Sequence, residues 1–168
     1  MGTSGNMAFV IDGETKAGYV HFDSYPSGLG TDVLEWLREN YAKPETHAAV
    51  QALKVVDDSS TPTPEQIEAL KQYANTNVST KQLDEWYVLL RETQGDPAST
   101  LAAGYVYGDR KIEPYRLGYF GEYTYVVNFD KRTFTASGYG HLLGHWSFDE
   151  LPTKDEFLKL TENDEDED

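Results

Sequence analysis

A chain of 168 residues with 39% hydrophobic and 13% aromatic residues can bury the core of one domain, which excludes a wholly disordered protein. It contains no cysteine, which excludes disulfides, thiol catalysis and cysteine-ligated zinc or iron–sulfur centres. The net charge is −15, and phosphate contacts need clusters of Lys and Arg, so direct binding to a nucleic-acid backbone is not expected.

The negative charge is concentrated at the C-terminus. Six of the charges lie within residues 162–168, which leaves −9 for the rest of the chain. We expect one α+β domain over residues 1–160 and a disordered acidic tail over residues 161–168. The sequence begins without a basic and apolar leader and has no apolar stretch as long as a membrane span, so we expect a cytoplasmic protein without a membrane partner.

Two strands are expected at the N-terminus, over residues 6–11 and 17–22. Asp12-Gly13 is a strong hairpin signal between them. We expect the connecting loop to continue through Lys16, and so to be longer than two residues.

The middle of the chain is expected to be helical. Thr31 is the expected N-cap of a helix that runs to Tyr41, and a weaker helix follows over residues 46–55. Residues 57–62 are expected to be a linker. Further helix starts are expected at residues 63–66, 79–82 and 96–97, the first of them as a capping box.

A second hairpin is expected near the C-terminus, with strands over residues 123–129 and 133–139. A final helix follows, capped at Thr153 and centred on Phe157. Hairpins at both ends pair most simply into one antiparallel sheet, with about four helices inserted between them and packed on one face. The predicted class is therefore α+β.

The segment over residues 21–32 is the most informative for function. It leads from a strand to a helix N-terminus, where unpaired backbone N–H groups and the positive end of the helix dipole favour an anion such as a phosphate. The alternative is a purely structural strand-to-helix crossover, shaped by Pro26 and the glycines, with Asp23 satisfying loop amides. The candidate ligand-binding residues are His21, Asp23, Ser24, Tyr25, Gly28, Gly30 and Thr31.

Two other groupings have weaker support. His141 and His145 have the spacing of metal ligands on a helix, but the glycines around them favour a loop or a strand edge, so no metal site is expected. The tyrosines over residues 105–125, with three cations among them, could stack on bases, although core and rim packing fits the interleaved acids better. The three cations of this tyrosine-rich segment are Arg110, Lys111 and Arg116. The sequence gives no reason to expect a cofactor.

Three segments near the N-terminus carry a resemblance: Met1-Gly2-Thr3, Asp12-Gly13 and residues 19–30, which contain a Tyr-x-His-Trp/Phe-Asp-Gly/Ser-Tyr-Pro signature. On these segments, and over residues 62–66, 84–87 and 123–134, the chain resembles a family of uncharacterised proteins from tailed bacteriophages and actinobacterial genomes. Ser4 stands where many members have Arg, which removes one cation. The resemblance implies a phage or prophage setting, with host cytoplasm as the location, and implies no activity.

Two hypotheses of function follow. The first is an accessory phage-type protein that acts by binding a host protein, since the chain is acidic and lacks the common catalytic motifs. The second is a protein that binds a nucleotide or phosphorylated metabolite, or a small hydrolase, using residues 21–31. A virion structural component is a weaker third.

Overall fold

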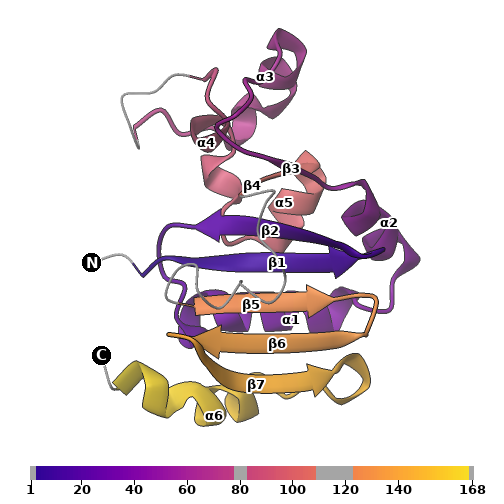
Figure 1. The fold of residues 1–168 in the computed structure, drawn as a ribbon, viewed down its shortest axis with the longest axis vertical. Coiled ribbons are helices and arrows are strands. Elements are labelled where there is room, and N and C mark those ends of the chain that lie inside the picture. Colours follow the sequence, from indigo (N-terminus) through magenta and orange to yellow (C-terminus); the bar gives the residue numbers. More distant parts are fainter. Residues whose placement is uncertain (1–2, 78–82, 109–122, 167–168) are drawn as a thin grey trace.

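The computed structural model describes residues 3–77, 83–108 and 123–166, with side chains as far as Thr161. Within these residues the protein is α+β, with a mixed, mostly antiparallel five-stranded sheet whose strands come from both ends of the chain (Figure 1). The sheet order is β2-β1-β5-β6-β7. Its strands are β1 (Gly5–Ile11), β2 (Glu14–Val20), β5 (Tyr123–Asn128), β6 (Thr133–Gly138) and β7 (His141–Ser147).

The two hairpins meet at a parallel pair in the centre of the sheet. β1 pairs with β5 in parallel, with Phe9 opposite Val127, whereas the other neighbours are antiparallel. The expected union of the N- and C-terminal hairpins is therefore confirmed, but they join in parallel. β7 extends the second hairpin by one strand that we did not predict, and it contains His141 and His145.

The first hairpin turn is tighter than expected. Asp12 (φ 52°) and Gly13 (φ 78°) form a two-residue turn, and β2 begins at Glu14, so the prediction of a loop through Lys16 is wrong. Positive φ at both turn positions matches the right-handed twist of the flanking strands. The carboxylate of Asp130, from the turn between β5 and β6, accepts hydrogen bonds from both turn amides at 2.8 and 2.9 Å.

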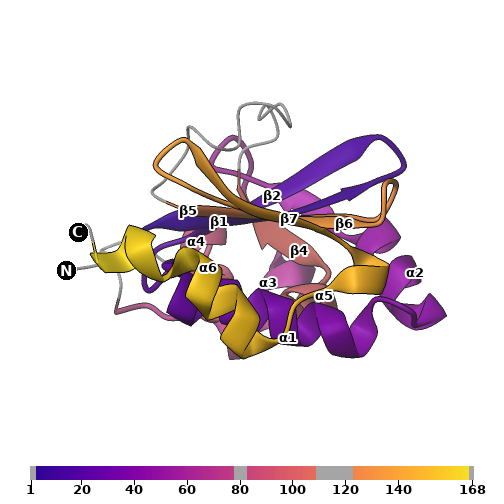
Figure 2. The same ribbon diagram turned by 90° about the horizontal axis from the view of Figure 1, so that it is seen from below.

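The core lies between one face of this sheet and the helices. α1 (Thr31–Asn40) and α6 (Lys154–Asp166) lie on the same side of the sheet in Figure 2. Alternate residues of the strands point toward them and are almost fully buried, which agrees with the period of two along a strand. These residues are Met7, Phe9, Ile11, Tyr123, Tyr125, Val127, Phe134 and Ala136.

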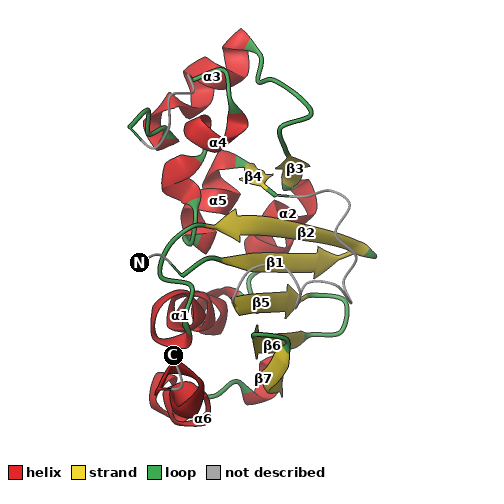
Figure 3. Cartoon of the chain, turned by 60° about the vertical axis from the view of Figure 1, so that its left-hand side comes forward, coloured by secondary structure: helices red, strands yellow, loops and turns green. Residues whose placement is uncertain are grey.

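Residues 44–77 and 83–107, most of the segment between the hairpins, form a unit at the β2 edge of the sheet (Figure 3). The unit has a small core of its own, and Val50 and Val106 from it pack in the larger core. Its two short strands pair in parallel, and Gly18 of β2 lets them approach, because a side chain there would collide with Val106. We call this unit the insert. Its elements are α2 (Pro44–Ala52), β3 (Lys54–Val56), α3 (Pro64–Leu70), the 3-10 turn η2 (Lys71–Tyr73), α4 (Trp86–Leu89), the 3-10 turn η3 (Arg91–Thr93), α5 (Pro97–Ala103) and β4 (Tyr105–Tyr107).

Several predicted helix caps are confirmed. Thr63 and Gln66 form the expected capping box of α3, and Asp96 accepts a hydrogen bond from Ser99 N at the start of α5. α5 ends at Gly104 in the left-handed conformation (φ 81°), as the glycine predicts. The helix start expected at residues 79–82 lies outside the described residues, and α4 is a single turn.

Lys16 joins the sheet to the insert. Its side chain is buried, and its Nζ donates to the carbonyl oxygens of Val50 and Gln51 at the C-terminal end of α2, at 2.7 and 2.9 Å. Such carbonyls have no partner within the helix, and a cation favours the negative end of the helix dipole. Burial lowers the pKa of Lys16, while Glu14 and Asp12 act in the opposite direction.

The C-terminal helix reaches further than expected. Thr153 and Glu156 form a capping box at its start, and α6 continues to Asp166, into the segment that we expected to be disordered. Among the described residues, no helix combines the length and apolar character needed to cross a membrane.

Candidate functional site

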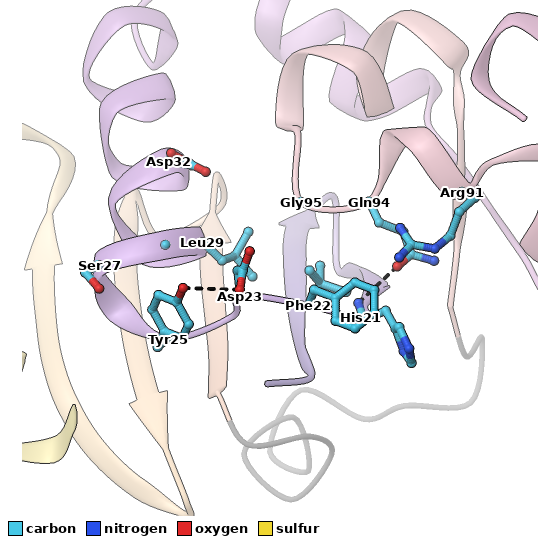
Figure 4. Close-up of a pocket in the computed structure, with 12 residues that line it drawn as sticks. His21, Phe22, Asp23, Tyr25, Ser27, Leu29, Asp32, Arg91, Gln94 and Gly95 are labelled. Atoms are coloured by element: carbon cyan, nitrogen blue, oxygen red, sulfur yellow. Dashed lines mark hydrogen bonds between the residues drawn. The ribbon is translucent and has the colours of Figure 1, made fainter. Parts of the chain in front are cut away.

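A pocket of about 490 Å³ opens at the corner where β2 leads into α1 (Figure 4). One wall is the end of β2 and the turn after it, the second is the start of the helical segment, and the third comes from η3 of the insert and the two residues that follow it. We call it the elbow pocket. Its lining is formed by residues 20–23, Tyr25, residues 27–29, Asp32, Arg91, Gln94 and Gly95.

The turn after β2 is strained at Asp23. This residue has φ 57°, an uncommon conformation for a residue other than glycine, and such strain is often found at functional sites. Leu29 N donates to the Asp23 carbonyl at 2.9 Å, and Tyr25 OH donates to Asp23 Oδ1 at 3.2 Å. Gly28 is required beside it, because a Cβ there would collide with the Asp23 carbonyl oxygen. The carboxylate of Asp23 is therefore held in place at the pocket.

The helical segment begins earlier than the sequence predicted. A π-helical turn, η1 (Pro26–Gly30), runs directly into α1, so Thr31 lies within the helix and is not its N-cap. Its hydroxyl donates instead to the carbonyl oxygens of Ser27 and Gly28, at 3.1 and 3.0 Å. Proline suits the first position of the helical segment because the missing N–H would have no helical acceptor there.

The backbone amides expected to bind an anion are already used. Gly28 N and Gly30 N donate to the Tyr25 carbonyl at 2.9 and 3.4 Å, and Leu29 N donates to Asp23 O. The prediction of an anion site built from unpaired amides at this helix start is therefore wrong. A ligand at this helix start cannot use these three amides.

Four of the seven residues predicted for the site line the elbow pocket: His21, Asp23, Tyr25 and Gly28. The other three, Ser24, Gly30 and Thr31, are buried and do not line the pocket. Ser24 is fully buried and its carbonyl accepts a hydrogen bond from Tyr125 OH at 2.8 Å. Gly30 packs against the rings of Tyr125 and Phe157, which a Cβ would approach to about 3.0 Å, and Thr31 is buried in the helix.

The wall supplied by the insert was not predicted. Gln94 Oε1 accepts a hydrogen bond from His21 N at 3.0 Å, although the two residues are 73 positions apart. The guanidinium carbon of Arg91 lies 5.4 Å from the centre of the Phe22 ring, which is typical of a cation–π contact. No local pattern in the sequence links residues 91–95 with residues 20–32.

The charges of the elbow pocket are divided between its walls. Asp23 and Asp32 lie on the helical side, and Arg91 lies on the insert side (Figure 4). Partial burial raises the pKa of the Asp32 carboxyl, Lys154 acts in the opposite direction, and Asp96 raises it further. No group of three potential metal ligands occurs within the part of the chain that the structure describes.

His21 lies just after the end of β2, and its imidazole is held by Tyr19 of that strand. Tyr19 OH lies 2.9 Å from His21 Nδ1, and burial raises the pKa of that phenol, so the hydroxyl is protonated at neutral pH. The arrangement leaves His21 Nε2 as the second polar atom of the ring. His21 can therefore contribute a donor or an acceptor, according to its tautomer.

The other candidate groupings have different outcomes. His141 and His145 lie on β7, an edge strand, where a separation of four residues spans about 13 Å, and His145 Nδ1 lies 2.8 Å from Thr135 Oγ1. The strand-edge expectation for the two histidines is confirmed. Arg110, Lys111 and Arg116 of the tyrosine-rich segment lie outside the described residues.

Comparison with protein-family models, with curated proteins and with solved structures found no match to this chain. The resemblance to phage and actinobacterial proteins therefore stays a prediction, and the case for a function depends on the elbow pocket itself.

Proposed function

We propose that the protein binds a small polar molecule in the elbow pocket. The observation that carries the proposal is the convergence, around a pocket of about 490 Å³, of ionisable and amide side chains from two parts of the chain that are far apart in sequence. Ligand pockets typically measure about 300–1,000 Å³ and combine apolar walls with a few placed polar groups.

The pocket combines an apolar surface with polar groups of fixed position. Val20 and Leu29 are buried and supply apolar surface. Asp23 is fixed by its contacts with Tyr25 and Leu29, and Gln94 is fixed by its contact with His21. Fixed polar groups lower the ordering cost of binding, which favours a specific ligand.

The charge of the pocket favours some ligands over others. Among the described lining residues, two carboxylates and one guanidinium give a net negative charge, and the backbone amides of residues 28–30 are engaged. A polyphosphate such as a nucleoside triphosphate is therefore disfavoured, although a nucleotide or metabolite with a single phosphate can still be accommodated at Arg91.

The test is a thermal-shift screen of nucleotides, phosphorylated metabolites, amino acids and amines, followed by calorimetry. A ligand at one hundred times its Kd should raise Tm by roughly 5 °C or more. Asp23→Asn should abolish this shift, since it removes the charge while Asn tolerates the same backbone conformation. Glu35→Gln, an exposed change on α1 outside the pocket, should bind as the parent does.

The proposal fails if no compound in the screen moves the melting temperature. It also fails if Asp23→Asn binds every ligand as tightly as the parent, because the pocket would then not be the site.

Binding of a host protein is a second candidate, favoured by the edge of β7. Within the described residues the sheet ends at this strand, and its Leu142 is 67% exposed, beside Tyr139 at 47%. An unpaired strand edge with exposed apolar side chains can accept a strand from another protein. The phage or prophage setting implied by the resemblance would supply such a partner.

Leu142→Lys should reduce capture of a stoichiometric host partner at least tenfold in a pull-down, as a charge blocks a strand edge. Leu160→Lys, a matched change at an exposed leucine of α6, should not reduce it. Equal loss in both variants, or unchanged capture by Leu142→Lys, would exclude the β7 edge as the docking surface.

A further inference from the structure

The insert wall of the elbow pocket contains two side-chain donors without an acceptor. Arg91 Nε and Gln94 Nε2 are both shielded from solvent, and neither has a hydrogen-bond partner in the structure. Buried N–H groups are nearly always paired, and an unpaired one costs about 1–3 kcal/mol. Two such donors three positions apart, both on residues that line one pocket, indicate that a ligand supplies the acceptor.

The orientation of the Gln94 amide is set by the backbone. Its Oε1 accepts the hydrogen bond from His21 N, which can only donate, so the opposite end of the amide must be the NH₂ group. Turning the amide by 180° would lose this hydrogen bond, so Gln94 Nε2 stays in its present position as a donor.

The Arg91 side chain can reach a ligand with little rearrangement. Its guanidinium stacks on Phe22, whose side chain is 51% exposed, so a shift of this ring gives up little buried apolar area. A guanidinium matches the planar geometry of a carboxylate or a phosphate, with two parallel N–H donors. The insert wall is thus suited to an oxyanion.

The facing wall has the opposite character. Asp23 and Asp32 are acceptors, and among the described residues that line the elbow pocket Arg91 is the one Lys or Arg. A simple anion would satisfy Arg91 and Gln94 but would bring its charge close to these two carboxylates. A ligand that also carries an ammonium group would satisfy both walls.

We infer that the ligand of the elbow pocket is a small zwitterion, with its oxyanion held by Arg91 and Gln94 and its ammonium group facing Asp23 and Asp32. This inference rests on the proposed function and specifies its ligand class. Amino acids and phosphorylated amines share this chemistry.

The first experiment is a titration of the full-length ¹⁵N-labelled protein, followed by NMR. The zwitterionic probes are glycine, L-phenylalanine and phosphoethanolamine. Each matched probe lacks one of the two charged groups: the corresponding hydroxy acids and inorganic phosphate lack the ammonium group, and the corresponding amines and ethanolamine lack the oxyanion. At least one zwitterion should move the amide resonances of His21, Gln94 and Gly95, with an affinity at least tenfold above that of its matched probes. Phosphoethanolamine and the amino acids distinguish a phosphate from a carboxylate as the bound oxyanion.

The second experiment removes each donor separately. Arg91→Met keeps the apolar stem on Phe22 and removes the guanidinium, and should weaken binding of that zwitterion about tenfold to hundredfold. Gln94→Glu keeps an acceptor for His21 N and removes the NH₂ donor, and should weaken it by a similar factor. Arg132→Met is the matched control, because Arg132 stacks on Phe148 at 5.5 Å away from the pocket, and it should change the affinity less than twofold.

The outcomes separate the inference from the proposed function. If the matched probes bind within threefold of their zwitterions, or only other compounds of the wider screen move the pocket resonances, the ligand class is wrong and the pocket is still a binding site. If nothing moves them, both proposals fail. Unchanged affinity in Arg91→Met and Gln94→Glu would overturn the assignment of the oxyanion to the insert wall.

Discussion

The phenol of Tyr107 is held in its protonated form by its surroundings. Burial raises its pKa, and so do the hydrogen bond from its hydroxyl to Asp58 Oδ2, 2.9 Å long, and the charge of that carboxylate. In the unfolded chain a tyrosine ionises near pH 10. Between pH 10 and the higher pKa of the folded state, the unfolded protein therefore binds fewer protons than the folded one.

This difference predicts an alkaline loss of stability. The contribution of Tyr107 should be fully present below about pH 10, and the free energy of unfolding should fall as pH rises through that value and above. Urea unfolding at pH 8 and pH 11 measures the effect in the parent and in Tyr107→Phe, which cannot ionise. The parent should lose more stability between the two pH values than the variant. An equal loss in both would show that Tyr107 does not contribute.

At the same scale, the candidate site was predictable only where its residues are close in sequence. His21, Asp23, Tyr25 and Gly28 were found because a turn-forming segment between a strand and a helix is visible locally. Arg91 and Gln94 were not, because the contact of Gln94 with His21 joins residues 73 positions apart. The role of the backbone amides was mispredicted because η1 begins five residues before Thr31, which leaves those amides with acceptors inside the turn.

Between elements, the two hairpin turns are joined through a single side chain. The Asp130 carboxylate accepts from Asp12 N and Gly13 N, two consecutive amides whose residues both have positive φ. Consecutive amides in this arrangement form a small anion-binding concavity. Here the anion is part of the chain, and it connects the N-terminal hairpin to the C-terminal one.

Removing this connection should destabilise the sheet. Asp130→Ala leaves the two amides to solvent, and since the site is exposed we expect a loss of about 1–2 kcal/mol in the free energy of unfolding. Asp84→Ala, a change of the same type at an exposed residue, should stay within about 0.5 kcal/mol of the parent. Urea unfolding followed by tryptophan fluorescence gives both values. A loss no larger than that of Asp84→Ala would contradict the role of Asp130.

The elements themselves were largely predictable, because their signals are local. Thr63 with Gln66, Asp96 and Gly104 mark helix ends by short-range hydrogen bonds or backbone preference, and each holds in the structure. The parallel pairing of β1 with β5 was not predictable, as it depends on contacts between distant segments. β3 and β4 were missed because three residues give too little periodicity to identify a strand. The helix expected over residues 46–55 is therefore wrong at its end, since α2 stops at Ala52 and β3 begins at Lys54.

At the scale of the whole molecule, the elbow pocket lies between two cores. The sheet with α1 and α6 forms the larger core, and the insert forms a smaller one around Trp86 and Leu89. Pocket residues come from both sides, and the hydrogen bond from His21 N to Gln94 Oε1 connects the two sides. A ligand that contacts both walls would therefore also stabilise the position of the insert relative to the sheet.

The parallel pair at the centre of the sheet has a consequence for biosynthesis. β1 is synthesised before the insert, but its neighbour β5 ends only at Asn128, after the whole insert has been made. Until then the β1 edge of the nascent hairpin has unpaired backbone N–H and C=O groups. Translation through the insert therefore sets the period during which this edge needs protection from aggregation, and a slower passage through those codons would lengthen it.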